Sequence, residues 1–377
     1  MLPSICFVAP NAYPLLSGDD RLQVIGGAEL QQVLLARELA GRGYPVVMIC
    51  WDFGQQDEKS IDGIRVLKAC RPGEGVPGLR FFYPRLASIW SCLQRANADI
   101  YYQRTAGFLT GVVAEYGRRT RRKSIFAAAG NPDLFPKTPR IRFARDRWIY
   151  EHGLRHVDLV VVQNDEQKRL SKLNYGREAV LIPNCYTVPI DTPARSRSVI
   201  LWVSTIKNIK QPGLFLELAQ AFPDIRFRMV GGPGSGAQAL YESIRKRALA
   251  MPNVEFTGFV PYAKVEEHFD DALMFINTSE SEGFPNTFLQ AWARGVPSIS
   301  FVDCGARVAG KTVGRVVGSM SEMIACVRQW LENDLELADA GGVCRAYVEG
   351  RHSTSKVVDM YEGVFAELLS RRFQKTK

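Results

Sequence analysis

The segment with the clearest chemical potential covers residues 279–297, which read SESEGFPNTFLQAWARGVP. The apolar run before it predicts a buried strand, and a helix is expected to begin at Pro285 or Asn286. A loop of this kind leaves backbone N–H groups unpaired at the helix N-terminus, where the helix dipole favours an anion. Glu282 stands at the mouth of this predicted anion site, and Gln290 follows further along the helix.

A second polar loop follows another apolar run, in residues 201–212 with the sequence LWVSTIKNIKQP. Pro212 fits the first position of a helix, so the two lysines of the loop, Lys207 and Lys210, fall between a strand end and a helix start. Cations at such a place can neutralise a phosphate group. The alternative is that both are ordinary exposed loop lysines.

Glycine loops follow two further predicted strands. Gly26 and Gly27 open a helix after the first strand and its long loop, and Gly232 lies in the run VGGPGSG at 230–236. Glycines let a backbone approach a phosphate or a sugar closely, although a tight turn alone would also explain them. Neither loop carries the full dinucleotide fingerprint, which disfavours a dehydrogenase.

Taken in order, these motifs resemble the donor-binding motifs of retaining glycosyltransferases of family four, which have the GT-B fold. In that family two acidic residues are separated by seven others, whereas here the second acid is replaced by Gln290. The resemblance implies that Glu282 contacts hydroxyl groups of the donor sugar, that Lys210 neutralises the diphosphate, and that Gln290 meets the ribose. An amide can still accept one hydroxyl hydrogen bond and donate another.

The resemblance also implies roles at less typical positions. The family usually has arginine where this chain has Thr205, so Lys207 is expected to substitute for it. Asp133, or else Asn131, is expected to contact the acceptor, because the loop 127–133 follows a strand and contains no histidine. The implied catalytic residues are Glu282, Lys210 and Asp133, and the implied donor-binding residues are Gly26, Gly27, Thr205, Lys207, Gly232, Phe259, Val260, Gly283, Phe284, Pro285, Asn286, Thr287 and Gln290.

Short apolar runs alternate with helical periodicity along the whole chain, which is typical of βαβ units on parallel sheets. The pattern lapses near 183–198, where we place an interdomain linker. We therefore predict an α/β protein with two doubly wound, Rossmann-like domains that face a cleft: an acceptor-binding domain at 1–190 and a nucleotide-sugar-binding domain at 198–352. A helix at 353–377 is expected to cross back and pack on the N-terminal domain.

Charge is unevenly distributed along the 377 residues. Residues 1–195 hold 27 Lys and Arg against 19 Asp and Glu, whereas the remainder holds 21 against 20. The excess could serve an anionic membrane surface or an anionic polymer, or it could be a solvated helix face; nucleic acid ranks last because no RNA-binding signature accompanies it. Scattered cysteines, no basic residue before Arg21 and no long apolar run favour a cytoplasmic protein, peripheral at the inner face of the membrane if it binds one.

The function expected from these observations is a retaining, metal-independent transfer of a sugar from a nucleotide-sugar, UDP- or GDP-linked, to a lipid-linked or polysaccharide acceptor. No metal and no other cofactor is expected. One alternative is a degenerate transferase that serves as a binding or scaffold subunit, which Thr205 and Gln290 suggest. Another is a nucleotide-sugar epimerase or a phosphorylase, although the histidine or cofactor lysine that such enzymes need in the cleft has no candidate here.

Overall fold

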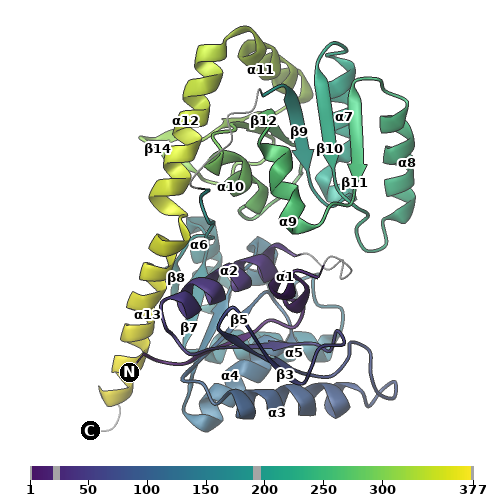
Figure 1. Ribbon diagram of the computed structural model, residues 1–377. Coiled ribbons are helices and arrows are strands. Elements are labelled where there is room, and N and C mark those ends of the chain that lie inside the picture. Colours follow the sequence, from purple (N-terminus) through teal and green to yellow (C-terminus); the bar gives the residue numbers. More distant parts are fainter. Residues whose placement is uncertain (1, 20–25, 190–196, 375–377) are drawn as a thin grey trace. The chain divides into compact units, whose positions relative to one another are not determined.

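The computed structural model describes residues 2–19, 26–189 and 197–374 (Figure 1). The chain forms two compact units. The first unit consists of residues 1–185 and 354–377, and the second unit of residues 186–353. The first boundary falls inside the linker expected at 183–198, of which residues 190–196 lie outside the described part of the chain.

The first unit is built on an eight-stranded sheet in which the outermost strand, β3, is antiparallel and its neighbours are parallel. Apart from the exposed edge strand β3, the strands carry apolar residues on both sides, so the sheet is buried on both faces. Its strands, in spatial order, are β3 (Glu58–Ile61), β4 (Ile64–Lys68), β2 (Val46–Cys50), β1 (Ile5–Val8), β5 (Ile100–Arg104), β6 (Lys123–Ala127), β7 (Leu159–Val162) and β8 (Ala179–Leu181).

Helices cover both faces of this sheet (Figure 1). On one face, Phe7 and Tyr102 pack with α1 (Tyr13–Ser17), α2 (Gly27–Gly41) and α13 (Thr354–Gln374). On the other face, Cys6 and Tyr101 pack with α3 (Ala87–Ala96) and α4 (Phe108–Thr120). The remaining helical segments are the π-turn η1 (Phe81–Leu86), the 3₁₀ turn η2 (Asn131–Leu134), α5 (Ala144–His156) and α6 (Asp165–Tyr175).

The C-terminal helix α13 belongs to the first unit. Its apolar residues Val358, Tyr361 and Phe365 are buried in the same core as the first strand. The guanidinium of Arg42, the residue that follows α2, donates hydrogen bonds to the carboxylates of Asp359 (2.6 Å) and Glu362 (3.0 Å). The chain therefore ends in the unit in which it began.

The second unit is built on a six-stranded parallel sheet. Its strands, in spatial order, are β11 (Val254–Gly258), β10 (Arg226–Val230), β9 (Val199–Val203), β12 (Ala272–Asn277), β13 (Ser298–Ser300) and β16 (Arg315–Val316), with a separate hairpin of β14 (Arg307–Val308) and β15 (Lys311–Thr312). Because β9 and β12 are neighbours, the loops that follow them begin side by side at the carboxyl edge of the sheet.

The helical segments of the second unit are η3 (Asn208–Lys210), α7 (Pro212–Gln220), α8 (Gln238–Leu249), α9 (Tyr262–Val265), η4 (Glu266–Phe269), α10 (Asn286–Ala293), α11 (Met320–Glu332) and α12 (Asp334–Arg351). The buried residues of α10 and α12 pack on one face of the sheet, and those of α7, α8 and α11 on the other. Tyr186 ties the linker to this unit, because its hydroxyl donates to Glu266 (2.9 Å) and accepts from Arg294 (2.7 Å).

The predicted alternation of strands and helices is confirmed in both units. The pattern did not predict β3, whose residues are mostly exposed, or α12, whose Gly341 and Gly342 disfavour a helix. Gly341 is needed there because a Cβ atom would lie 2.3 Å from the carbonyl oxygen of Gly295. A packing contact between distant segments thus outweighs local helix propensity.

Candidate functional site

Glu282 is held in place by the loop between β12 and α10. Asn277, the last residue of β12, accepts a hydrogen bond from the backbone N–H of Ser279 (2.9 Å). The buried Ser279 hydroxyl in turn donates to the Glu282 carboxylate (2.7 Å). The carboxylate is therefore oriented by a side chain that is itself fixed at the strand end.

Lys210 meets Glu282 from the neighbouring loop. Its ammonium group forms an ion pair with the Glu282 carboxylate, and both side chains are largely buried, with exposed fractions of 20% and 16%. Its backbone carbonyl accepts a hydrogen bond from the Thr278 hydroxyl (2.7 Å), which accepts one from the Trp202 indole (3.0 Å). The structure thus brings together two residues far apart in sequence that were both predicted to be catalytic.

The start of α10 has the composition of an anion site. Pro285 is its N-cap, no side chain caps the helix, and its first turn contains no acidic residue. Phe284 fixes the entry to the helix, since its ring packs on His352 with centroids 4.7 Å apart. The half-buried Asn286 and Thr287 form the first helical positions.

Gln290 is buried inside the same helix, with an exposed fraction of 3%. Its side-chain nitrogen has no hydrogen-bond partner among the described residues. A buried amide donor without a partner is costly, so this atom favours a ligand with an acceptor oxygen.

The glycines of the loop after β10 are needed for close packing, whether or not the loop also binds a ligand. A Cβ atom at Gly232 would lie 2.9 Å from the Cβ of Phe259, and one at Gly234 would lie 2.4 Å from Cγ of Lys207. Phe259 and Val260, directly after β11, are half-buried. Thr205 and Lys207 are exposed, and Lys207 forms no ion pair within residues 197–374, so its charge is available to a ligand.

Gly283 is half-buried in the loop that leads to α10, whereas the other three predicted residues, Gly26, Gly27 and Asp133, lie in the first unit. Gly26 is the N-cap of α2 in an extended conformation, and a Cβ atom there would lie 1.9 Å from a carboxylate oxygen of Glu29. Residues 20–25, which precede it, lie outside the described part of the chain.

Asp133 has a structural environment that the sequence did not reveal. It is completely buried, and its two carboxylate oxygens accept hydrogen bonds from the Ala129 backbone N–H (2.7 Å) and the Arg140 guanidinium (2.9 Å). These contacts hold the loop after β6 without any acceptor. Direct contact with an acceptor would require this arrangement to open, so the predicted catalytic role of Asp133 has no support from its surroundings.

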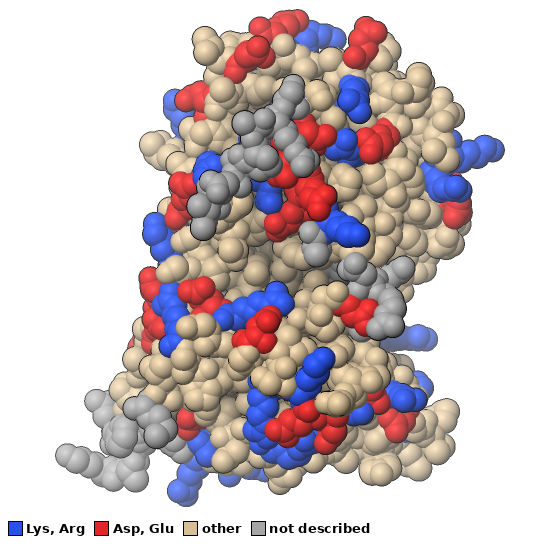
Figure 2. Space-filling model, in the orientation of Figure 1, with Lys and Arg blue, Asp and Glu red and all other residues tan. Residues whose placement is uncertain are grey.

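The basic excess of the first unit is densest at 118–123 and 140–147, and most arginines of these two stretches have acidic partners. Arg118 and Arg119 both bind Glu115, and the hydrogen bond from Arg118 lowers the pKa of that carboxyl to about 2. Arg122 pairs with Asp99 at 2.7 Å. Figure 2 shows basic and acidic side chains next to one another in several places on the visible face. The interpretation as a solvated helix face therefore accounts for part of the charge.

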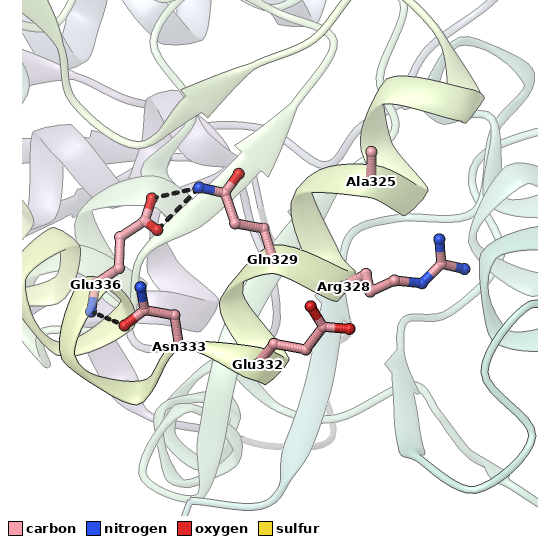
Figure 3. A pocket seen from close by; sticks show the side chains of 6 residues that line it. All are labelled: Ala325, Arg328, Gln329, Glu332, Asn333 and Glu336. Atoms are coloured by element: carbon pink, nitrogen blue, oxygen red, sulfur yellow. Dashed lines mark hydrogen bonds between the residues drawn. The ribbon is translucent and has the colours of Figure 1, made fainter.

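One pocket of the second unit lies outside the predicted site. A pocket of about 460 Å³ on α11 and α12 is lined by polar residues that bind one another: Gln329 donates to both oxygens of Glu336, and Asn333 accepts from the Glu336 backbone (Figure 3). It contains none of the predicted residues. No three His, Cys, Asp or Glu side chains within the described residues are grouped to hold a metal ion.

Sequence reasoning missed the residues that support the site. Thr278 and Ser279 looked like loop residues, although a polar pair directly after a buried strand is a usable signal. His352 gave no local signal, because it reaches Phe284 only through the packing of α12 on α10.

Comparison with known families agrees with this geometry. A model described as "Glycosyl transferase 4-like domain" matches residues 26–185, and one described as "Glycosyl transferases group 1" matches residues 197–333. The two matches correspond closely to the first and the second unit and together cover most of the chain.

Curated relatives are distant and only partly covered. The chain is 26% identical over 164 residues to one subunit of the phosphatidylinositol N-acetylglucosaminyltransferase of Arabidopsis thaliana. It is 19% identical over 237 residues to the GtfA subunit of the UDP-N-acetylglucosamine–peptide N-acetylglucosaminyltransferase of Streptococcus pneumoniae. These alignments cover 40% and 58% of this chain and only 36% and 45% of the relatives' own lengths.

Solved structures share the fold over nearly the whole chain. Sucrose-phosphate synthase from Thermosynechococcus elongatus has a TM-score of 0.77 at 15% identity, and covers 98% of this chain and 100% of its own. HepE from Anabaena, in complex with UDP and glucose, has a TM-score of 0.74 at 16% identity, with 97% and 100% covered. A glycosyltransferase from Rickettsia africae has a TM-score of 0.71 at 16% identity, with 98% and 99% covered. With both units matched by glycosyltransferase models and this fold shared throughout, the chain belongs to the group 1 glycosyltransferases of family four, which have the GT-B fold.

Proposed function

We propose that this protein transfers a sugar, with retention of configuration and without a metal ion, from a nucleotide-sugar to a lipid-linked or polysaccharide acceptor. The observation that carries the proposal is the meeting of Lys210 and Glu282 beside the uncapped start of α10. A cation and a helix N-terminus together suit a diphosphate, and a carboxylate beside them suits sugar hydroxyls.

In the proposed reaction, the bond between the anomeric carbon and the diphosphate oxygen breaks as the acceptor oxygen bonds to the same face of that carbon. Lys210 stabilises the negative charge that develops on the departing diphosphate, and Glu282 orients the sugar. The acceptor's proton passes to an oxygen of the departing phosphate, so no protein side chain has to act as a base. In the ligand-free protein, the ion pair keeps each of these two groups compensated.

A uridine nucleotide is the favoured donor, because HepE and the pneumococcal transferase GtfA were both solved with UDP and a sugar. The test is turnover of UDP-glucose, UDP-N-acetylglucosamine and GDP-mannose by the parent protein, with the anomeric configuration of the product read by NMR. Inversion would contradict the retaining mechanism. If the parent turns over none of these donors yet binds UDP, the degenerate binding protein is the better account.

A peripheral membrane location is proposed from a different surface of the first unit. A groove of about 800 Å³ is lined by Phe82, Trp90, Trp148 and Ile149 of η1, α3 and α5, with Arg118 and Arg119 of α4 at its side. Phe82 and Trp148 are 59% and 69% exposed. Aromatic rings beside arginines suit the interface of an anionic membrane. No helix of the described residues is long and apolar enough to cross a membrane.

Flotation with vesicles containing anionic lipid tests this location at low and at high salt. The parent is expected to float at low salt, and the double variant Phe82→Ser, Trp148→Ser to remain in solution. Leu335→Ser is the matched control, since Leu335 is an exposed apolar residue of the second unit, 85% exposed. A parent that does not float at low salt would remove the membrane from the proposal.

A further inference from the structure

Two successive hydrogen bonds lead from a buried tryptophan in the core of the second unit to the backbone of Lys210. The indole of Trp202 on β9 donates to the hydroxyl of Thr278, the first residue after β12 (3.0 Å). That hydroxyl donates to the backbone carbonyl of Lys210 (2.7 Å). Trp202 and Thr278 are 1% and 0% exposed, so water does not compete for these contacts. We call Trp202 and Thr278 the Lys210 anchor.

The chemistry of the three groups fixes the direction of both hydrogen bonds. An indole N–H can only donate, and a carbonyl oxygen can only accept. The Thr278 hydroxyl therefore accepts from the indole and gives its single hydrogen to the carbonyl. A valine at this position would keep the shape of the side chain but would leave the buried indole N–H without its partner, which is costly.

Packing holds the indole at the start of the anchor. Trp202 belongs to the core that the sheet forms with α7, and its ring centroid lies 6.3 Å from that of Phe215. A Cβ atom at Gly231 would lie 3.5 Å from the indole, so the glycine loop after β10 lies beside the ring. Phe215 is a residue of α7, which begins two residues after Lys210. The anchor therefore ties Lys210 to a closely packed part of the unit.

The turn that contains Lys210 is strained and is tied at a second point. Gln211, the next residue, has a φ of +45°, in the left-handed region that residues other than glycine rarely adopt. Such a backbone persists where the surrounding contacts enforce it. The carbonyl of Ile209 accepts a hydrogen bond from the backbone N–H of Glu280 (2.9 Å). Two successive carbonyls of this turn therefore bind the loop after β12.

Lys210 is thus held by two contacts of different kinds. Its ammonium group pairs with Glu282, and its carbonyl binds the anchor. In the proposed reaction the diphosphate takes the ammonium group and the sugar takes the carboxylate, so the ion pair has to open. The contact through the carbonyl involves neither of these groups, so it can persist when the donor binds.

We propose that Thr278 and Trp202 are positioning residues, which keep Lys210 directed at the diphosphate once the donor has separated its ammonium group from Glu282. The inference rests on the proposed function, because it concerns the lysine assigned to the diphosphate there. The stem of a lysine is flexible, so a fixed backbone narrows the range of positions that its charge can reach. A displaced ammonium group loses most where the negative charge is largest, in the transition state and in released UDP.

The test compares kcat, KM and UDP affinity in the parent and in Thr278→Val, with the nucleotide-sugar that the parent turns over. Thr278→Val is expected to lower kcat about tenfold with a smaller rise in KM, and to weaken UDP binding about fivefold, as the loss of a buried hydrogen bond implies. Thr278→Ser keeps the hydroxyl and should retain most of the parent's kcat. A serine variant as slow as the valine variant would overturn the inference.

Ser298→Ala is the matched control for a general loss of packing. The Ser298 hydroxyl accepts from the Trp292 indole at 3.0 Å, and both residues are buried, but neither belongs to the anchor. This variant should lower the melting temperature about as much as Thr278→Val and should keep the parent's kcat. An equal loss of kcat in both variants would assign the effect to packing and would overturn the inference.

A double variant tests whether Thr278 acts through Lys210. Lys210→Ala has no ammonium group to position, so adding Thr278→Val to it should change UDP affinity by less than about twofold. A full fivefold loss in that background would show that Thr278 acts in another way. If Thr278→Val does not fold, Trp202→Phe removes the N–H at the start of the anchor and is expected to lower kcat about threefold.

Turnover and UDP binding in the parent separate this inference from the proposed function. If the parent turns over a nucleotide-sugar and Thr278→Val matches it, only the inference fails. If the parent binds UDP without turnover, the proposed transfer fails, and weaker UDP binding by Thr278→Val still supports the anchor. If the parent does not bind UDP, both fail.

Discussion

The two units place polar residues at the carboxyl edges of similar sheets, but the residues are paired differently. In the second unit, Glu282 binds both Lys210 and Ser279, so the two residues proposed to be catalytic, Lys210 and Glu282, are held without a ligand. In the first unit, Arg104 and its neighbours keep buried atoms without partners. The difference indicates that Lys210 and Glu282 are held in position before any ligand binds, whereas these polar atoms of the first unit are not.

Removing either member of the Lys210–Glu282 ion pair should have the largest effect on turnover. Lys210→Ala and Glu282→Ala are each expected to lower turnover roughly 100-fold to 1,000-fold, because each removes a group that stabilises or orients the reacting donor. Turnover with each nucleotide-sugar is the measurement. Lys207→Ala is the matched control, with a loss below about tenfold expected, because that lysine is exposed and outside the pair. Undiminished turnover in the first two variants would show that the site is assigned wrongly.

A second substitution tests whether the buried carboxylate of Asp133 stabilises the fold or takes part in the reaction. Asp133→Asn should lower the free energy of unfolding by about 2 kcal/mol, because it weakens the contacts with Arg140 and the Ala129 N–H. Denaturant unfolding measures this loss. Glu166→Gln, which removes an exposed pair with Arg169, should change it by less than about 0.5 kcal/mol. If Asp133→Asn instead lost turnover while its stability stayed unchanged, a catalytic role of Asp133 would be supported.

Among the described residues of the second unit, only Gln290 has a buried side-chain polar atom without a hydrogen-bond partner. Gln290→Glu is expected to tighten UDP binding about fivefold, equivalent to about 1 kcal/mol, because a carboxylate accepts stronger hydrogen bonds from ribose hydroxyls. The ligand-free variant should melt earlier, since it buries a carboxylate. Titration with UDP and a melting curve test both statements. Weaker UDP binding would indicate that the glutamine nitrogen itself is the contact.

The smallest expected effect concerns the paired charges beside the apolar groove. The hydrogen bond from Arg118 lowers the pKa of Glu115 from 4.5 to about 2. This contribution to stability is therefore present above pH 4.5 and is lost as pH falls towards 2. Glu115→Gln should flatten the stability curve slightly in that window, because the arginines are exposed. An identical slope in parent and variant would show that the pair does not contribute.

The sequence predicted the polar residues of the second unit better than those of the first unit, for a physical reason. Glu282, the start of α10 and Gln290 fall within one continuous strand–loop–helix pattern, and Lys210 follows the strand next to it. In the first unit, by contrast, the buried polar residues Arg104, Asn131 and Gln163 are far apart in the sequence, and Arg104 reads as the end of a strand. Its unpaired charge appears only when the packing of α13 and the position of Asn184 are known.

The pairing of Asp133 with Arg140 could not be predicted either. Both residues fall in a loop whose course depends on tertiary packing, and the burial of the carboxylate leaves no trace in the local sequence. Strands and helices were predictable because their periodicity reflects which side of each element faces a core.

The most direct measurement of the central claim is thermal stability of the parent and of Lys210→Ala with UDP, GDP, ADP, CMP and NAD. A ligand at 100 times its dissociation constant adds about 2.7 kcal/mol, which raises the melting temperature by several degrees. We predict such a rise with a nucleoside diphosphate, UDP in particular, and loss of most of it in Lys210→Ala. A rise with NAD alone, or the same UDP effect in both proteins, would contradict the assignment of the donor site.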